Sequence, residues 1–180
     1  MKTEKYYSLG FVEYNDDEYY FKGICYFFGY GVDMDRQKAV EMYSIGVRSN
    51  NAKCMYSLAV TLKNTEPEKS QSLFSQAFVD LKEEASCGDE ISQRMISCYY
   101  LFGDRGVKQN IDKAKKWLLL SAENDDPDAQ FNLAGCYENG EFFEKNPILA
   151  KKWYSRSALL GNTKSAIKLM EMEEASYEDE

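Results

Sequence analysis

The sequence of 180 residues contains no histidine. This absence removes the imidazole base of Ser-His-Asp and Cys-His catalysis, and the commonest nitrogen ligand of protein-bound metals. The turn at Gly29 and Gly31 lacks the third glycine of a dinucleotide-binding loop. Acidic clusters at 16–18 and 125–128 lie where helices are expected to begin, and there negative charge complements the helix dipole. We therefore expect no enzyme activity, no cofactor and no metal.

Basic residues are outnumbered by acidic ones. The sequence has 22 Lys and Arg against 30 Asp and Glu, which gives a net charge of −8. Nucleic acids and anionic membrane surfaces both attract basic patches, so neither is expected as a partner. The Lys-Lys pairs at 115–116 and 151–152 are isolated, and we expect them on solvated helix faces.

Long apolar runs and paired cysteines are also absent. No run approaches the roughly 18 apolar residues of a membrane span, and residues 1–10 lack the apolar stretch of a secretion signal. The five cysteines are odd in number and lack Cys-x-x-Cys spacing, which argues against a disulfide framework or a zinc site. We expect a cytoplasmic protein, with signal-independent secretion as an effector as the open alternative.

The sequence does contain a repeated pattern. A Tyr-x-x-Gly turn is followed by a polar residue, then by a Lys-Ala or Ala step and a bulky residue. The clearest copies are Tyr26, Gly29, Asp35, Ala39 and Tyr43; Tyr100, Gly103, Asn110, Ala114 and Trp117; and Tyr137, Gly140, Asn146, Ala150 and Trp153. A spacing of 36 residues separates the last two alanines. A period of this length is typical of a solenoid of helical hairpins.

The repeat divides the chain into about four hairpins, here called units one to four, and a closing helix. The expected segments are an irregular N-terminal cap at 1–15, units at 16–49, 50–88, 89–125 and 126–161, a capping helix at 162–172 and an acidic tail at 173–180. Small residues at 23, 57, 97 and 134 would let the two helices of a unit approach closely.

The second helix of each unit is expected to start at a polar cap. Asp35, Asn110 and Asn146 suit this place because their side chains accept backbone N–H bonds. Unit two has Glu66 there, a poorer cap, with Thr65 as the alternative. Unit two also lacks the Tyr-x-x-Gly turn, and its second helix is expected to be about two turns longer than the others.

These residues resemble the Sel1-like repeat, a relative of the tetratricopeptide repeat. Unit one matches its pattern at Gly23, Tyr26, Gly29, Gly31, Val32, Asp35, Lys38, Ala39 and Tyr43, and unit four at Ala129, Leu133, Tyr137, Gly140, Ala150, Trp153, Tyr154, Ala158 and Gly161. Unit three matches with one inserted residue, and unit two only weakly. The resemblance implies an all-α fold, a right-handed α/α superhelix that acts as an adaptor and holds a protein or peptide in its concave face.

In tetratricopeptide-like stacks the first helix of each hairpin lines the inner groove. Inward positions are then the candidates for partner contact: Tyr20, Phe27, Arg94, Phe131, Glu138 and Asn139. Aromatic residues and arginine are the types that dominate interface energies. Packing against a neighbouring repeat is the alternative role, above all for Tyr20 and Phe27.

The leading hypothesis is a non-catalytic scaffold, expected to be a monomer, that binds a protein or peptide in its groove. One alternative is a structural protein that self-associates by stacking its end repeats. The other is a regulatory or effector protein that engages an enzyme through the long unit-two helix and the acidic tail.

Overall fold

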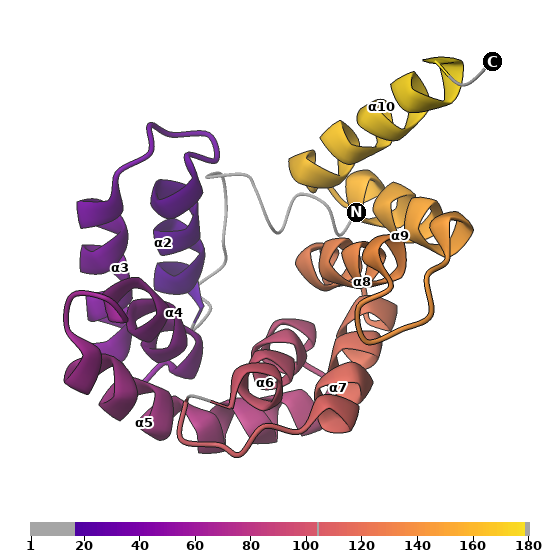
Figure 1. The fold of residues 1–180 in the computed structure, drawn as a ribbon. Coiled ribbons are helices and arrows are strands. Elements are labelled where there is room, and N and C mark those ends of the chain that lie inside the picture. Colours follow the sequence, from indigo (N-terminus) through magenta and orange to yellow (C-terminus); the bar gives the residue numbers. More distant parts are fainter. Residues whose placement is uncertain (1–16, 104, 179–180) are drawn as a thin grey trace.

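The chain forms an arc of helical hairpins in the computed structural model (Figure 1). The structure describes residues 17–103 and 105–178, so the expected cap at 1–15 lies outside the described residues. The helices are α2 (Glu18–Phe28), α3 (Arg36–Arg48), α4 (Ala52–Leu62), α5 (Pro67–Ser86), α6 (Glu90–Phe102), α7 (Ile111–Glu123), α8 (Pro127–Asn139), α9 (Pro147–Leu159) and α10 (Thr163–Glu178). The described residues contain no strand, and the predicted all-α solenoid of helical hairpins is confirmed.

Each unit is one pair of helices. Helices α2, α4, α6 and α8 pack on α3, α5, α7 and α9 respectively, and each unit packs on the next. The first helix of each pair lies on the inner side of the arc, and the second forms its outer side (Figure 1). Helix α10 packs on α9 and closes the stack.

The predicted caps start three of the outer helices. The side chains of Asp35, Asn110 and Asn146 accept the backbone N–H of the third residue that follows, at 2.9–3.0 Å. Glu66 lies at the cap of α5 but makes no capping bond. Thr65 does not replace it, because its hydroxyl donates to the carbonyl of Leu62 instead.

Two helices are long. Helix α5 has 20 residues against 13 in each of α3, α7 and α9. Helix α10, expected to end at Met172, continues to Glu178, so most of the acidic stretch at 173–180 is helical. The closing helix therefore extends beyond the units on which it packs.

The core is unevenly distributed along the arc. One continuous cluster runs through units one to three and includes the fully buried Tyr43, Phe74, Leu81 and Tyr99. The fourth unit and its neighbours are held by two small clusters, which centre on Leu133 and on Ala134, Ala150 and Tyr154. All five cysteines are free: Cys25 and Cys54 are buried, Cys98 and Cys136 are half-buried, and Cys87 is exposed.

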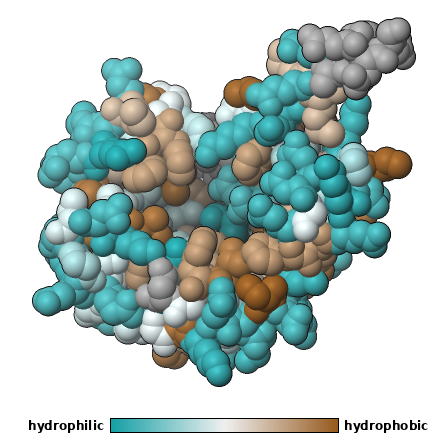
Figure 2. Space-filling model, viewed as in Figure 1, coloured by the Kyte–Doolittle hydropathy of each residue, from teal (hydrophilic) through white to brown (hydrophobic). Residues whose placement is uncertain are grey.

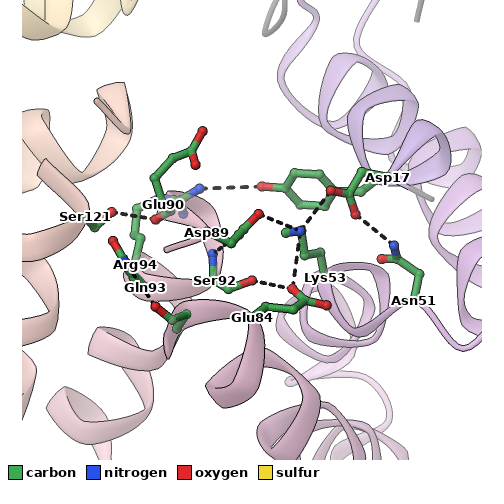
Figure 3. A network of polar contacts seen from close by, with 12 residues as sticks. Asp17, Asn51, Lys53, Glu84, Asp89, Glu90, Ser92, Gln93, Arg94 and Ser121 are labelled. Carbon is green, nitrogen blue, oxygen red and sulfur yellow. Dashed lines mark hydrogen bonds and ion pairs between the residues drawn. The ribbon is translucent and has the colours of Figure 1, made fainter. Parts of the chain in front are cut away.

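A buried lysine joins the first three units (Figure 3). The ammonium of Lys53 lies 2.8 Å from Asp17 of unit one, 3.3 Å from Glu84 on α5 and 3.1 Å from Asp89 at the start of α6. Its side chain is 5% exposed. These ion pairs fix the starts of the inner helices relative to one another.

Candidate partner-binding groove

A cavity of about 500 Å³ opens between units three and four. Its walls come from α6, α7, α8, the α8–α9 loop, α9 and α10. Leu101, Phe102 and Phe131 supply apolar wall, and Lys115 and Glu141 lie among its charged residues. The space-filling view shows the inner side of the arc as a hollow, with hydrophobic residues gathered along it and hydrophilic residues on the outer margin (Figure 2).

Four of the six sequence-predicted residues lie together in this cavity: Arg94, Phe131, Glu138 and Asn139. They come from α6 and α8, the inner helices of units three and four. Further along the same helices, Cys98 and Leu101 of α6 and the backbone of Gly135 of α8 line the same wall.

Arg94 is held by carboxylates of the next unit. Its Nε lies 3.0 and 3.1 Å from the two carboxylate oxygens of Asp126, and its Nη2 lies 3.6 Å from Asp128. Burial raises the pKa of Asp126 to about 6 against the opposing pull of Arg94. Burial alone would lower the pKa of Arg94, but these anions hold it well above its ordinary value. At neutral pH the two residues form a buried ion pair in the wall of the cavity.

Phe131 and Glu138 are positioned by Tyr154 of α9. The ring centres of Phe131 and Tyr154 are 5.6 Å apart. The Tyr154 hydroxyl donates to Glu138 at 2.7 Å, and Lys168 of α10 lies 3.9 Å from the same carboxylate. Burial, reinforced by the bond to Glu138, raises the pKa of Tyr154, so the phenol stays protonated and remains a donor. Tyr154 and Lys168 therefore both hold the carboxylate of Glu138 in place.

Tyr20 and Phe27 of unit one do not line this cavity. Tyr20 is 3% exposed, and its hydroxyl lies 3.5 Å from Arg94, 74 residues away. Phe27 is half-buried, with the guanidinium of Arg36 at 5.6 Å over its ring. Both side chains pack against the main core, the alternative that the sequence left open for them.

Sequence reasoning missed the groove residues outside the inner helices. Phe142 and Phe143 belong to the α8–α9 loop, Lys115 to α7 and Lys168 to α10. Helical periodicity carries no signal for a loop residue or for a residue of an outer helix that reaches the groove. Phe142 did leave a trace in the sequence, because it stands where unit one has the second glycine of its turn, Gly31.

The described helices include none long and apolar enough to cross a membrane. Within the same residues, no group of three or more His, Cys, Asp or Glu side chains is arranged to hold a metal ion.

Comparison with known proteins identifies the repeat. The Sel1 repeat family profile matches residues 19–51, 91–126 and 127–162, together more than half of the chain. The chain belongs to the Sel1 repeat family. Unit two falls outside the matched ranges from its third residue onward, in line with its missing turn and long second helix. Sel1 repeat proteins generally mediate protein–protein interactions and are typically non-catalytic scaffolds.

Three relatives illustrate the range of this family. A 72-residue stretch, 39% of the chain, is 32% identical to the chitin synthase regulator SKT5 of Saccharomyces cerevisiae and spans a tenth of that protein. A Sel1 repeat protein from Oxalobacter formigenes is 20% identical with a TM-score of 0.45, over 88% of this chain and 45% of the other. The Escherichia coli protein c5321, a protective antigen of uropathogenic strains with an SLR fold, is 28% identical with a TM-score of 0.46, over 86% and 32%. The chain thus spans less than half the length of each of these relatives.

Proposed function

We propose that this Sel1 repeat chain is a non-catalytic scaffold that binds a segment of a partner protein in the groove between units three and four. The observation that carries the proposal is the cavity of about 500 Å³, whose apolar wall includes Phe102 and Phe142, 53% and 40% exposed. Aromatic side chains left in contact with solvent in a concave site are the usual anchors of protein recognition. We place the interaction in the cytoplasm, where the five free cysteines would stay reduced.

A pair of substitutions on the groove rim tests this function. Phe102→Ser with Asn139→Arg changes two exposed side chains at the ends of α6 and α8. The matched control, Val79→Ser with Gln76→Arg, makes the same kind of change on the exposed face of α5. Purified protein is crosslinked in native lysate, and captured proteins are quantified by mass spectrometry. We expect a partner to be lost with the groove pair by about tenfold or more and retained by the control pair.

A partner that is lost with the α5 pair and retained by the groove pair would place the binding site on the outer face of α5. A partner retained by both pairs of substitutions would contradict the groove as the site. Loss with the α5 pair alone would favour the alternative in which the long helix engages an enzyme, a role also suggested by the similarity to the yeast chitin synthase regulator.

Self-association is the second candidate, because the last two helices carry large apolar residues in solvent. These are Ile148, Leu159, Ile167 and Met170, each between 56% and 83% exposed. Terminal repeats must cover such a face or pair it with another surface. In this case the purified chain would crosslink to itself, and light scattering would report a mass above one chain.

A further inference from the structure

At one position in the groove wall, helix α8 has a glycine, Gly135, and therefore no side chain. Gly135 lies in the middle of α8, where the corresponding residues of the first three units are Ile24, Leu58 and Cys98. Glycine inside a helix is less favourable than alanine, because its backbone loses more conformational freedom on folding. No close packing requires it here, since a Cβ added at Gly135 would meet only the Tyr154 hydroxyl, at 3.7 Å. The missing side chain leaves open space in the cavity wall.

The cavity also holds a residue in a backbone conformation that favours glycine. Phe142 has φ +63°, and the glycines at the corresponding place in units one and three, Gly31 and Gly106, have φ +70° and +79°. A bulky residue at positive φ is a genuine outlier, and such strain gathers at functional sites. The strained turn presents the Phe142 ring at the cavity, where it is 40% exposed. Helix α8 thus lacks a side chain where the cavity needs room, and the next loop holds an aromatic ring at its edge.

The charges at the cavity favour a basic occupant. Two of the three cations of the lining are paired with carboxylates, Arg94 with Asp126 and Asp128 and Lys168 with Glu171, while Lys115 lies 4.8 Å above the ring of Phe143 and keeps its charge. The carboxylates in or beside the lining, namely Asp126, Asp128, Glu138, Glu141 and Glu171, outnumber these cations. Glu141 is exposed and takes part in none of the ion pairs found among the described residues. The whole chain carries a net charge of −8, which adds to the attraction of a cationic segment.

We propose that this cavity is an anchor pocket for a basic peptide segment of another protein. One large apolar side chain of the partner enters the space beside Gly135, between Phe102, Phe131 and Phe142. A Lys or Arg of the same segment pairs with Glu141. This inference rests on the proposed scaffold function and specifies the chemistry of the segment that the groove accepts.

Random peptides of about 12 residues, enough for three turns of helix, are displayed on phage and selected against the full chain. Enriched peptides share one Phe, Trp, Leu or Met and a nearby Lys or Arg. Their affinity is then measured by fluorescence anisotropy. Gly135→Leu fills the pocket and weakens binding about tenfold or more, as expected for loss of one buried apolar side chain. Gly135→Ala is the matched control, and its affinity stays within about threefold of the original.

Two more substitutions separate a binding role from a structural one. Phe142→Gly relieves the strained turn, so the unfolding temperature rises while peptide affinity falls. Glu141→Lys reverses the charge preference, and peptides with Glu in place of the basic residue bind it about two- to fivefold more tightly than the originals. A change confined to fold stability would produce neither result.

The proposal is overturned if no peptide is enriched, if enriched peptides lack the apolar anchor, or if Gly135→Leu and Phe142→Gly bind as the original does. Suppose instead that peptides bind Gly135→Leu and Phe142→Gly as tightly as the original chain but do not bind the pair Phe102→Ser and Asn139→Arg. That result would overturn the anchor pocket and leave the scaffold function standing. Peptides that bind all of these variants as tightly as the original chain would contradict both the anchor pocket and the scaffold function. A dimer of the original chain that Gly135→Leu dissociates would make a second copy the occupant, which also overturns the proposal.

Discussion

At the scale of single residues, the buried Lys53 joins three units through its ion pairs. Burial alone would lower its pKa, but Asp17, Asp89 and Glu84 hold that pKa above its ordinary value. Burial alone would raise the pKa of Asp89, but Lys53 and the backbone N–H of Ser92 hold it below its ordinary value. Asp89 therefore contributes stability above about pH 4 that is lost on acidification, and Lys53 contributes stability below about pH 10 that is lost on alkalinisation.

Lys53→Met should destabilise the protein most at neutral pH and less on acidification. It leaves the three carboxylates without their cation, so at pH 7 the free energy of unfolding should fall by about 3–5 kcal/mol. Because protonation then relieves the repulsion among the carboxylates, the loss should shrink as the pH falls towards 4. Urea unfolding followed by circular dichroism at several pH values measures this. Lys69→Met, which removes an exposed pair with Glu66, is the control and should cost no more than about 1 kcal/mol. A loss equal at pH 7 and pH 4 would contradict the argument.

At the scale of helices, two glycines on inner helices have opposite surroundings. A Cβ at Gly23 of α2 would lie 2.2 Å from the ring of Tyr43, which is 1% exposed and has no room to move. The same atom at Gly135 of α8 would meet only the Tyr154 hydroxyl, at an ordinary contact distance of 3.7 Å. Gly23 lets the two helices of unit one approach closely, as its small size in the repeat pattern suggests. Gly135 opens the cavity.

The same substitution at these two glycines should therefore have opposite effects on stability. Gly23→Ala should lower the free energy of unfolding by about 1–3 kcal/mol through overpacking against Tyr43. Gly135→Ala should raise it by roughly 0.5–1 kcal/mol through helix propensity. Urea titrations of the two single variants give both values. Losses of equal size would mean that α8 needs its glycine for packing.

The start of each outer helix shows how far sequence patterns reach at this scale. Asp35, Asn110 and Asn146 were predictable as caps because capping needs only one polar side chain near the backbone that it serves. Glu66 failed as a cap, and α5 begins without one because its long apolar face packs in the core. The end of α10 was not predictable from its acidic composition. Helix formation is cooperative, so the last residues extend a helix that has already formed before them.

At the scale of the whole molecule, curvature brings distant units together. Arg94 reaches Tyr20 across 74 residues, and the ammonium of Lys164 in α10 lies 5.0 Å over the ring of Phe28 at the end of α2. Repeat spacing predicts the number of hairpins. The resemblance to tetratricopeptide-like stacks implied which helices face inward, and four of the residues so chosen line the cavity. Neither predicts the contacts of Arg94 and Lys164, because the curvature is the sum of small rotations from one repeat to the next. For the same reason the sequence could not show that Tyr20 would be buried.

The uneven core predicts that the two ends of the arc unfold separately. Units one to three share a continuous core of large side chains, while residues 127–178 rely on small clusters rich in alanine. Regions with less buried apolar surface open at lower free energy. In native-state hydrogen exchange with rising urea, amides of α8 to α10 should therefore exchange at lower urea than those of α4 to α6.

Two core truncations test this division of the chain. Leu133→Ala should lower the opening free energy of α8 to α10 by about 2–5 kcal/mol and leave that of α4 to α6 unchanged, because Leu133 belongs to a small separate cluster. Phe74→Ala, in the continuous core, should lower the opening free energy of α4 to α6 by about 3–5 kcal/mol. Equal losses along the whole chain in both variants would instead make the arc one cooperative unit. A separately opening C-terminal part would also let the groove between units three and four adjust to a partner, since α8, the α8–α9 loop, α9 and α10 supply part of its lining.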